Sequence, residues 1–383
     1  MAPTNWTMNP IHSGVLATKQ NDPAERLAYI ALALIPGLGA RRLAALLSKF
    51  GTGGAVLQAT LQELSEVEGI TRAAATAILS PPLSSAQALH DRATAKGHRT
   101  LVPCDPDYPA QLRSIPDPPV MLFAVGNTDL LAQRSVAIVG SRKHTRYGAD
   151  IAKRLGEVAA SAGIPVVSGM ARGLDAIAQS AALDAGGTSI GVLGTGADII
   201  YPWENTALFN RMESEGLLLT EHPPGDRGFP GAFPRRNRLI SGLSQVLVVV
   251  EAAEASGTLV TVTSALEQGR EVLVVPGPIT SPTSQGTNRL IRDGATPLLS
   301  AEDMLPAFGL AASGPTSKAL LPPPGNLSPD EARVFAVLSA EPRHVDDIAL
   351  AAGLPIGLVL GTLLGLELGG VVEQLPGNLY RRR

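Results

Sequence analysis

Val136-Ala-Ile-Val-Gly-Ser-Arg142 contains the pattern that decides the fold: a short apolar run ends in a glycine and an arginine, and an amphipathic segment follows at 147–162. Similar apolar runs recur up to about residue 305, separated by amphipathic segments such as 174–185 and 259–269. Strands this apolar are buried on both faces, which is typical of parallel sheets covered by helices. The sequence therefore predicts a Rossmann-like, doubly wound and mainly parallel α/β sheet, with strands at 136–139, 165–168, 189–193, 217–220, 246–250, 272–275 and 297–299.

The region before this sheet, residues 24–98, is predicted to be an all-helical module. It contains a weak internal repeat, Ile35-Pro-Gly-Leu-Gly39 and Val67-Glu-Gly-Ile70, in which a tight glycine turn opens a helix. This is the pattern of a helix-hairpin-helix or SAM-like domain. Such a turn can offer free backbone N–H groups to a phosphate. A module that only packs on its neighbour explains the pattern equally, so both interpretations stay open.

The region after the sheet is predicted to begin with a linker at 310–326, because Pro315 and Pro322-Pro-Pro324 lie there among Gly and Ser. Helices are then expected at 328–339, 346–352 and 356–368, followed by a hairpin within 369–383 around Pro376-Gly-Asn378. Three helices and a hairpin are the outline of a winged helix. The predicted division is a disordered tail at 1–23, the helical module at 24–98, a Rossmann-like domain at 99–309, the linker at 310–326, and a winged-helix-like domain at 327–383.

The composition narrows the class of protein. With 45% hydrophobic residues among 383, the chain is not wholly disordered, and a single cysteine, Cys104, excludes a disulfide framework. The first residues lack the pattern of a secretory signal, so a cytoplasmic location is expected. Residues 351–372 are apolar, but a helix over 356–368 would be about 20 Å long, too short for a hydrocarbon core of about 30 Å. We therefore expect no membrane insertion.

Candidate binding groups follow the strands, because ligands of parallel sheets bind beyond the carboxyl ends. The loops Gly140–Arg146, Ser168–Gly173 and Gly194–Asp198, and the segment Phe233–Arg238, are rich in glycine or arginine. Although the net charge is −3, residues 134–172 hold seven Lys or Arg against two Asp or Glu. Together these features predict a shared phosphate-binding pocket. Salt bridges on helix faces are the competing explanation for the arginines, which are Arg142, Arg172, Arg236 and Arg238.

The sequence lacks the motifs of several classes of enzyme. The first strand is not followed by Gly-x-Gly-x-x-Gly, and there is no Walker A sequence, which argues against a dinucleotide enzyme and a P-loop ATPase. His144 and His222 are the only histidines in the predicted sheet domain, so neither a metal cluster nor a catalytic triad is expected. The sequence thus predicts a domain that binds phosphates without reacting them, with no cofactor, metal or catalytic residue.

Five motifs in order resemble those of the DprA/Smf family of DNA-processing proteins, and Asp107-Tyr-Pro109 resembles the entry into that family's domain. The resemblance implies a protein that binds single-stranded DNA without sequence specificity, protects it, and loads the RecA recombinase during natural transformation. It also implies a homodimer without catalysis in that role; duplex DNA remains an open second ligand. The motifs are Val136–Arg142, Ser168–Asp175, Gly194–Pro202, Phe233–Leu243, and Val249–Ala252 with Ser256–Thr258.

Matched to the family residue by residue, the phosphate pocket and DNA groove are implied at Ser141 and Arg142, at Gly169 and Arg172, and at 236–238. Many relatives carry Lys where this chain has Arg172, which keeps the charge and changes the hydrogen-bond geometry. The full set of candidate DNA- or phosphate-binding residues is Gly140, Ser141, Arg142, Arg146, Tyr147, Ser168, Gly169, Arg172, Gly173, Gly194, Gly196, Arg235, Arg236, Asn237, Arg238, Ser256, Gly257 and Thr258.

Base stacking is expected to be a smaller contribution, because only 4% of the residues are aromatic. The predicted third helix of the winged domain, 356–368, has no Lys or Arg, although such helices normally carry basic residues into a DNA groove. A protein contact, or a DNA contact limited to the wing and to Arg381–Arg383, is the preferred interpretation. The aromatic candidates in the loops are Tyr147, Tyr201, Trp203, Phe229 and Phe233.

Two other functions remain as alternatives. Nucleotide phosphoribohydrolases have a similar sheet and a Gly-Ser-Arg-type loop, but their second motif is Pro-Gly-Gly-x-Gly-Thr followed by Glu. Here Ala255-Ser-Gly-Thr-Leu259 stands instead, with Glu251 upstream. A winged-helix transcription regulator with a nucleotide-sensing domain is the other alternative, and the uncharged third helix disfavours it.

Overall fold

The computed structural model describes residues 22–311, 327–339 and 342–382. It forms two compact units, Met1–Ala312 and Ser313–Arg383. The predicted tail up to residue 21, and the predicted linker from residue 312, lie outside the described residues.

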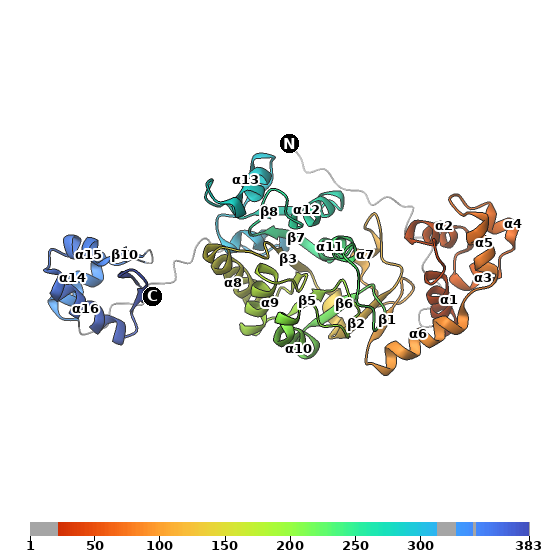
Figure 1. The fold of residues 1–383 in the computed structure, drawn as a ribbon, viewed down its shortest axis with the longest axis horizontal. Coiled ribbons are helices and arrows are strands. Elements are labelled where there is room, and N and C mark those ends of the chain that lie inside the picture. The colour runs from red at the N-terminus through yellow and green to blue at the C-terminus, as the bar shows by residue number, and fades with distance from the viewer. Residues whose placement is uncertain (1–21, 312–326, 340–341, 383) are drawn as a thin grey trace. The chain divides into compact units, whose positions relative to one another are not determined.

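A nine-stranded sheet forms the centre of the first unit, in the order β1-β2-β6-β5-β4-β3-β7-β8-β9 (Figure 1). The strands from β6 to β9 along this order are parallel, which confirms the predicted fold class. The parallel strands are β3 (Ser135–Val139), β4 (Val166–Ser168), β5 (Ser189–Val192), β6 (Leu217–Thr220), β7 (Ser244–Val249), β8 (Glu271–Val274) and β9 (Thr296–Pro297).

The first two strands at one end of the sheet were not predicted. β1 (Arg99–Leu101) and β2 (Leu122–Gly126) extend the sheet, and β2 pairs antiparallel with both β1 and β6. β1 is only three residues long, too short for a periodic signal, and its register is set by pairing with residues more than twenty positions away. The sheet is therefore mixed at one edge and parallel elsewhere.

Helices cover both faces of the sheet because alternate strand residues point to opposite sides. Val136 and Ile138 pack with α8, α9 and the 3-10 helix η5, while Ala137 and Val139 belong to the core cluster that holds α11 and α12. α10 covers the β5–β6 end of the sheet. The helices are α7 (Ala110–Arg113), α8 (Arg146–Ser161), α9 (Leu174–Asp184), α10 (Thr206–Glu215), α11 (Ala232–Leu243), α12 (Thr258–Glu267), α13 (Gln285–Arg292) and η5 (Ala301–Phe308).

The order of the strands creates a switch point between β3 and β7. From β3 the chain moves outward through β4, β5 and β6, and then returns through α11 to β7 on the other side of β3. The helices that follow β3 and β7, α8 and α12, consequently lie on opposite faces of the sheet. Doubly wound sheets bind ligands at the carboxyl ends of the strands beside such a switch point.

The N-terminal region is helical, as predicted. Both predicted glycine turns are present: Gly37 and Gly69 adopt φ of +78° and +81°, a conformation that L side chains rarely adopt, and precede α2 and α5. The helices share a core with Met121 and Phe123 beside the sheet edge. They are α1 (Pro23–Ala33), α2 (Ala40–Phe50), α3 (Gly53–Gln58), α4 (Leu61–Ser65), α5 (Arg72–Leu79) and α6 (Leu83–Ala95).

The second unit has the predicted winged-helix outline, with an additional short strand in the order β10-β12-β11. Among the described residues, no single helix is long and apolar enough to cross a membrane; α15 and α16 pass together by length and composition, but are bent by 105°. The elements are α14 (Pro329–Val337), β10 (Arg343–His344), α15 (Val345–Ala352), α16 (Ile356–Leu368), β11 (Val372–Leu375) and β12 (Leu379–Arg382).

Candidate nucleic-acid interface

The loop after β3 folds back on itself before α8 begins. The Ser141 hydroxyl donates to the Lys143 carbonyl at 2.6 Å and accepts from the Lys143 N–H at 3.0 Å. Thr145 then caps α8, because its hydroxyl accepts from the N–H of Gly148 at 3.1 Å. Ser141 is thus used to shape the loop, and this shape leaves the Arg142 side chain exposed.

Glu251 joins this loop to β7 across the switch point. It lies two residues after the end of β7, is only 2% exposed, and accepts from both the backbone N–H and the hydroxyl of Thr145. A Cβ at Gly148 would lie 2.5 Å from the Glu251 carboxyl carbon, so only glycine fits there. The sequence showed Glu251 only as an acid upstream of a glycine motif; its role depends on a contact across more than one hundred residues.

Asp175 joins the β3 and β4 loops in the same way. Its buried carboxylate accepts from the N–H groups of Gly169 at 3.1 Å and Gly140 at 3.4 Å. Burial raises the pKa of Asp175, while Arg236 and these N–H groups act in the opposite direction. Gly173 adopts φ of +86°, and a Cβ there would lie 2.5 Å from the Ser141 carbonyl oxygen. These glycines therefore allow two loops to approach closely.

Arg236 and Arg238 are turned inward on α11. Arg236 is 6% exposed and donates to the carbonyls of Val192 and, at 2.8 Å, Gly169. Burial lowers the pKa of Arg236 to about 10, and the nearby Asp175 opposes this shift. Arg238 pairs with Asp117 at 3.0 Å and with Glu221 at 2.7 Å. Both guanidinium groups thus have internal partners: Arg238 forms salt bridges, as the competing explanation of the arginines states, whereas Arg236 is held by backbone carbonyls.

The exposed arginines of the candidate set lie on the loops and helix starts. Within the described part of the chain, Arg142, Arg146 and Arg235 have no carboxylate within 4.0 Å. Arg172 is also exposed and pairs with Glu204 at 2.9 Å, an arrangement that an approaching phosphate can replace. Arg142 lies near enough to the buried Arg236 to depress its pKa. Exposed cationic groups, of which Arg172 is paired with Glu204, therefore follow β3 and β4.

The remaining polar candidates mostly make internal contacts. The Ser168 hydroxyl is buried and donates to the Ile138 carbonyl at 2.6 Å, and the Asn237 side chain accepts from Arg236. The Tyr147 hydroxyl donates to the Pro276 carbonyl at 3.0 Å, with its ring partly exposed. At the start of α12, the Ser256 hydroxyl accepts from the Thr258 N–H at 3.2 Å. Gly257 between them is open to its surroundings, since a Cβ there would meet nothing within 4 Å.

Glycines after β5 allow neighbouring parts of the chain to pack closely. A Cβ at Gly194 would lie 2.8 Å from the Phe233 ring, and one at Gly196 would lie 2.6 Å from the Pro223 carbonyl oxygen. Phe233 in turn packs against Tyr201, with ring centroids 5.1 Å apart. Trp203, close by in sequence, is 77% exposed. An aromatic surface therefore follows the β5 loop.

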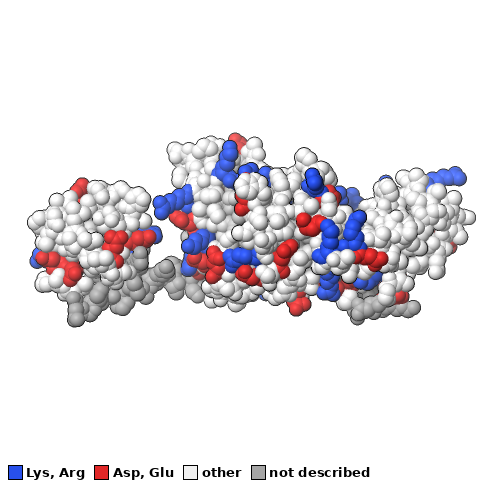
Figure 2. All heavy atoms as spheres, turned by 60° about the horizontal axis from the view of Figure 1, so that its bottom comes forward, with Lys and Arg blue, Asp and Glu red and all other residues white. Residues whose placement is uncertain are grey.

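Acidic and basic side chains are interspersed on the face seen in Figure 2, in agreement with the small net charge. Among the described residues, no group of three or more His, Cys, Asp or Glu could hold a metal ion. Because the charges are interspersed, we expect positive charge to act at local sites, such as the β3 and β4 loops, and not over a whole face of the protein.

Comparison with known proteins identifies the family. Residues 99–309 match the family described as DNA recombination-mediator protein A, and residues 318–378 match the DprA winged helix domain. The chain belongs to the DprA family. The match spans the whole sheet, including the loops that carry the candidate residues. DprA-family proteins act in DNA processing, which confirms the class of function that the motifs indicated.

Individual relatives support the same assignment. Protein Smf from Synechocystis is 33% identical over 396 residues, covering 94% of this chain and 99% of the relative; Protein Smf from Escherichia coli is 40% identical over 74% and 77% of the two chains. The X-ray structure of DprA from Streptococcus pneumoniae aligns with a TM-score of 0.63 and 32% identity, covering 75% and 98%. DNA processing protein A from Helicobacter pylori, whose single-stranded DNA binding mode is described as unique, aligns with a TM-score of 0.51 and 30% identity, covering 55% and 95%.

Proposed function

We propose that this DprA-family protein binds single-stranded DNA without sequence specificity through the exposed arginines at the carboxyl ends of β3 and β4. The proposal rests on one observation: some arginines of the motifs are buried and others are exposed. Arg236 fixes the loops from inside, while Arg142, Arg146 and Arg172 remain on the surface. Guanidinium groups bind phosphates bidentately, and a row of them follows a backbone whatever its bases.

The aromatic surface after β5 would add to this affinity. Trp203 and Tyr201 are more than half exposed, and so is Phe229 in the loop after β6, which leaves these rings accessible for stacking. Bases stack on such rings with about 1–3 kcal/mol each. The Arg172–Glu204 pair lies beside Trp203 in sequence, so a strand held at Arg172 would bring its bases toward these rings.

The wider role follows the family. The protein would protect incoming single-stranded DNA in the cytoplasm, load RecA recombinase during natural transformation, and act as a homodimer, with two sites on one strand raising avidity. No reaction is required, and duplex DNA is a second ligand to be tested. The exposed side chains along α16 include no cation, which favours a protein contact over DNA reading there; they are Ile356, Leu358, Leu360, Leu364 and Leu368.

The experiment is binding of a labelled oligo-dT, measured by fluorescence anisotropy, for wild type, Arg142→Ala and Arg172→Ala. Arg154→Ala is the matched control, because Arg154 is an exposed arginine on α8 that pairs with Glu302 away from the loops. We expect both loop variants to bind several-fold more weakly and the control to bind like wild type. Wild-type binding that is absent, or unchanged in both variants, would overturn the proposal; base release from nucleoside monophosphates would then test the phosphoribohydrolase alternative.

A further inference from the structure

The 3-10 helix η3 (Trp203–Asn205) lies against the loop after β4, which carries part of the proposed DNA interface. Two contacts hold it there. The Glu204 carboxylate pairs with Arg172 at 2.9 Å, and the Asn205 side-chain amide donates to the Met170 carbonyl at 2.9 Å. An acidic side chain is therefore placed directly on one of the arginines that we assign to DNA binding.

This contact sets Arg172 apart from the other exposed arginines of the interface. Of the residues that the structure describes, no carboxylate lies within 4.0 Å of Arg142, Arg146 or Arg235. Both members of the Arg172–Glu204 pair are partly exposed, with 59% and 34% of their side chains accessible. Exposed ion pairs are weak, favoured by no more than about fivefold over the separated groups. A phosphate, which accepts two hydrogen bonds from a guanidinium group, can therefore replace the carboxylate.

We propose that Glu204 competes with DNA phosphates for Arg172 and thereby limits the affinity of this site for single-stranded DNA; this inference rests on the proposed function. In the free protein the carboxylate neutralises Arg172, and a strand that binds there must displace it. Asn205 keeps η3 on the loop, so the carboxylate is always available to return. Glu204 is thus a negative determinant of affinity, next in sequence to the exposed Trp203 ring.

The proposal fixes the sign of a substitution. Glu204→Gln keeps the shape of the side chain and removes its charge, so Arg172 is available to a phosphate before the strand arrives. Oligo-dT should therefore bind about threefold more tightly than to wild type, a gain within the range of exposed ion pairs. The gain should shrink as salt rises, because ions screen both the ion pair and the phosphate contact.

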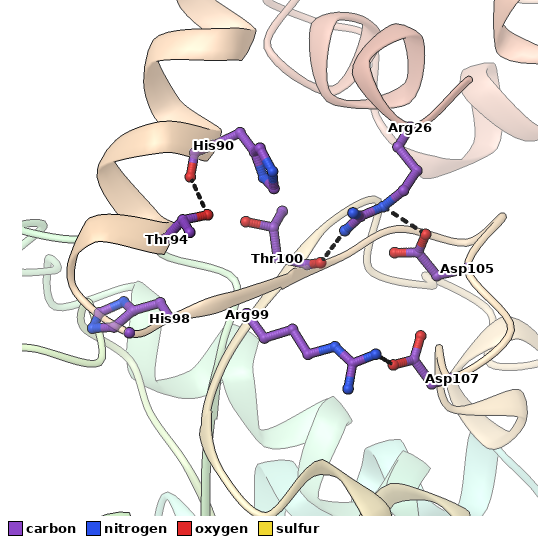
Figure 3. Close-up of a pocket in the computed structure, with 9 residues that line it drawn as sticks. Arg26, His90, Thr94, His98, Arg99, Thr100, Asp105 and Asp107 are labelled. Carbon is purple, nitrogen blue, oxygen red and sulfur yellow. Dashed lines mark hydrogen bonds and ion pairs between the residues drawn. The ribbon is translucent and has the colours of Figure 1, made fainter. Parts of the chain in front are cut away.

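A second exposed ion pair offers a matched control. Arg99 pairs with Asp107 beside the pocket drawn in Figure 3, and 54% and 30% of the two side chains are accessible. β1 is antiparallel to β2, which is antiparallel to β6, so Arg99 at the start of β1 lies at the sheet edge opposite to the carboxyl ends. Asp107→Asn consequently removes the same charge from a similar pair, away from the loop after β4.

The test is fluorescence anisotropy of labelled oligo-dT with the full chain. The proteins compared are wild type, Glu204→Gln, Asp107→Asn, Arg172→Ala, and the double variant that combines Arg172→Ala with Glu204→Gln. We expect Glu204→Gln to tighten binding and Asp107→Asn to leave it unchanged. In the Arg172→Ala background, Glu204→Gln should give no gain, because the group for which carboxylate and phosphate compete is then absent.

Three results would overturn the proposal: Glu204→Gln binds no more tightly than wild type, its gain is the same with and without Arg172, or Asp107→Asn gives an equal gain. The last two would make Glu204 an ordinary surface charge. Failure of the proposed function is a different outcome. Wild type would then not bind oligo-dT, or both Arg142→Ala and Arg172→Ala would bind it as tightly as wild type.

Discussion

Replacing Arg236 by Met should destabilise the first unit strongly, although this residue lies in the most basic of the motifs. The change removes two hydrogen bonds to the carbonyls of Gly169 and Val192 and leaves the buried Asp175 carboxylate without its nearby positive charge. Leaving a buried acceptor without its donor costs about 1–3 kcal/mol. Two carbonyls lose their donor while Asp175 keeps its two backbone donors, so the expected loss is about 3 kcal/mol.

The assay is thermal unfolding followed by circular dichroism, with Arg235→Met as the control on the neighbouring, exposed residue. At about 2 °C per kcal/mol for a unit of this size, Arg236→Met should unfold about 6 °C earlier. Adding Asp175→Asn should recover part of the loss, because the carboxylate that lacks a counter-charge is then gone. Equal unfolding temperatures for Arg236→Met and Arg235→Met would refute the structural role of Arg236.

Three further changes test other parts of the structure. Gly148→Ala places a Cβ against the Glu251 carboxylate, and should lower the free energy of unfolding by about 1–3 kcal/mol in urea titrations; an unchanged midpoint would contradict the close approach. Trp203→Ala should weaken oligo-dT binding by about 1–3 kcal/mol, measured by anisotropy, and equal affinity would exclude stacking there. The pKa of Asp303 lies below its usual 3.8, because hydrogen bonds from Ser300 and Leu299 outweigh burial. Asp303→Asn should therefore lower the free energy of unfolding at neutral pH, and by less as the pH falls below about 4. A difference in unfolding free energy between wild type and Asp303→Asn that grows in acid would contradict the lowered pKa.

The parallel strands could be predicted because each is a short apolar run that reports its own burial. β3, for example, was predicted at 136–139 and observed at Ser135–Val139. β1 carries a weaker signal, since it is three residues long and is held by antiparallel pairing with residues more than twenty positions away. β2, Leu122-Phe-Ala-Val-Gly126, is as apolar as β3, so its composition indicates a strand that was not predicted. Local sequence therefore indicates the strands other than β1, whose pairing depends on distant residues.

The same limit applied to the site. The motifs showed which residues gather at the carboxyl ends, but not which way each side chain turns. Arg236 and Arg142 look alike in sequence, yet one is buried against two carbonyls and the other is exposed. Glu251 and Asp175 were not among the candidates because their partners, Thr145 and the glycine N–H groups, are brought near only by the fold.

The most direct test of the proposed DNA interface is the salt dependence of oligo-dT binding for wild type, Arg142→Ala and Arg154→Ala. For single strands the slope of log K against log salt is about −0.7 per phosphate neutralised, so removing one contact should make the slope shallower by about 0.7. We predict this change for Arg142→Ala and the wild-type slope for Arg154→Ala. A wild-type slope in Arg142→Ala, even with weaker binding, would contradict a phosphate contact at the loop after β3.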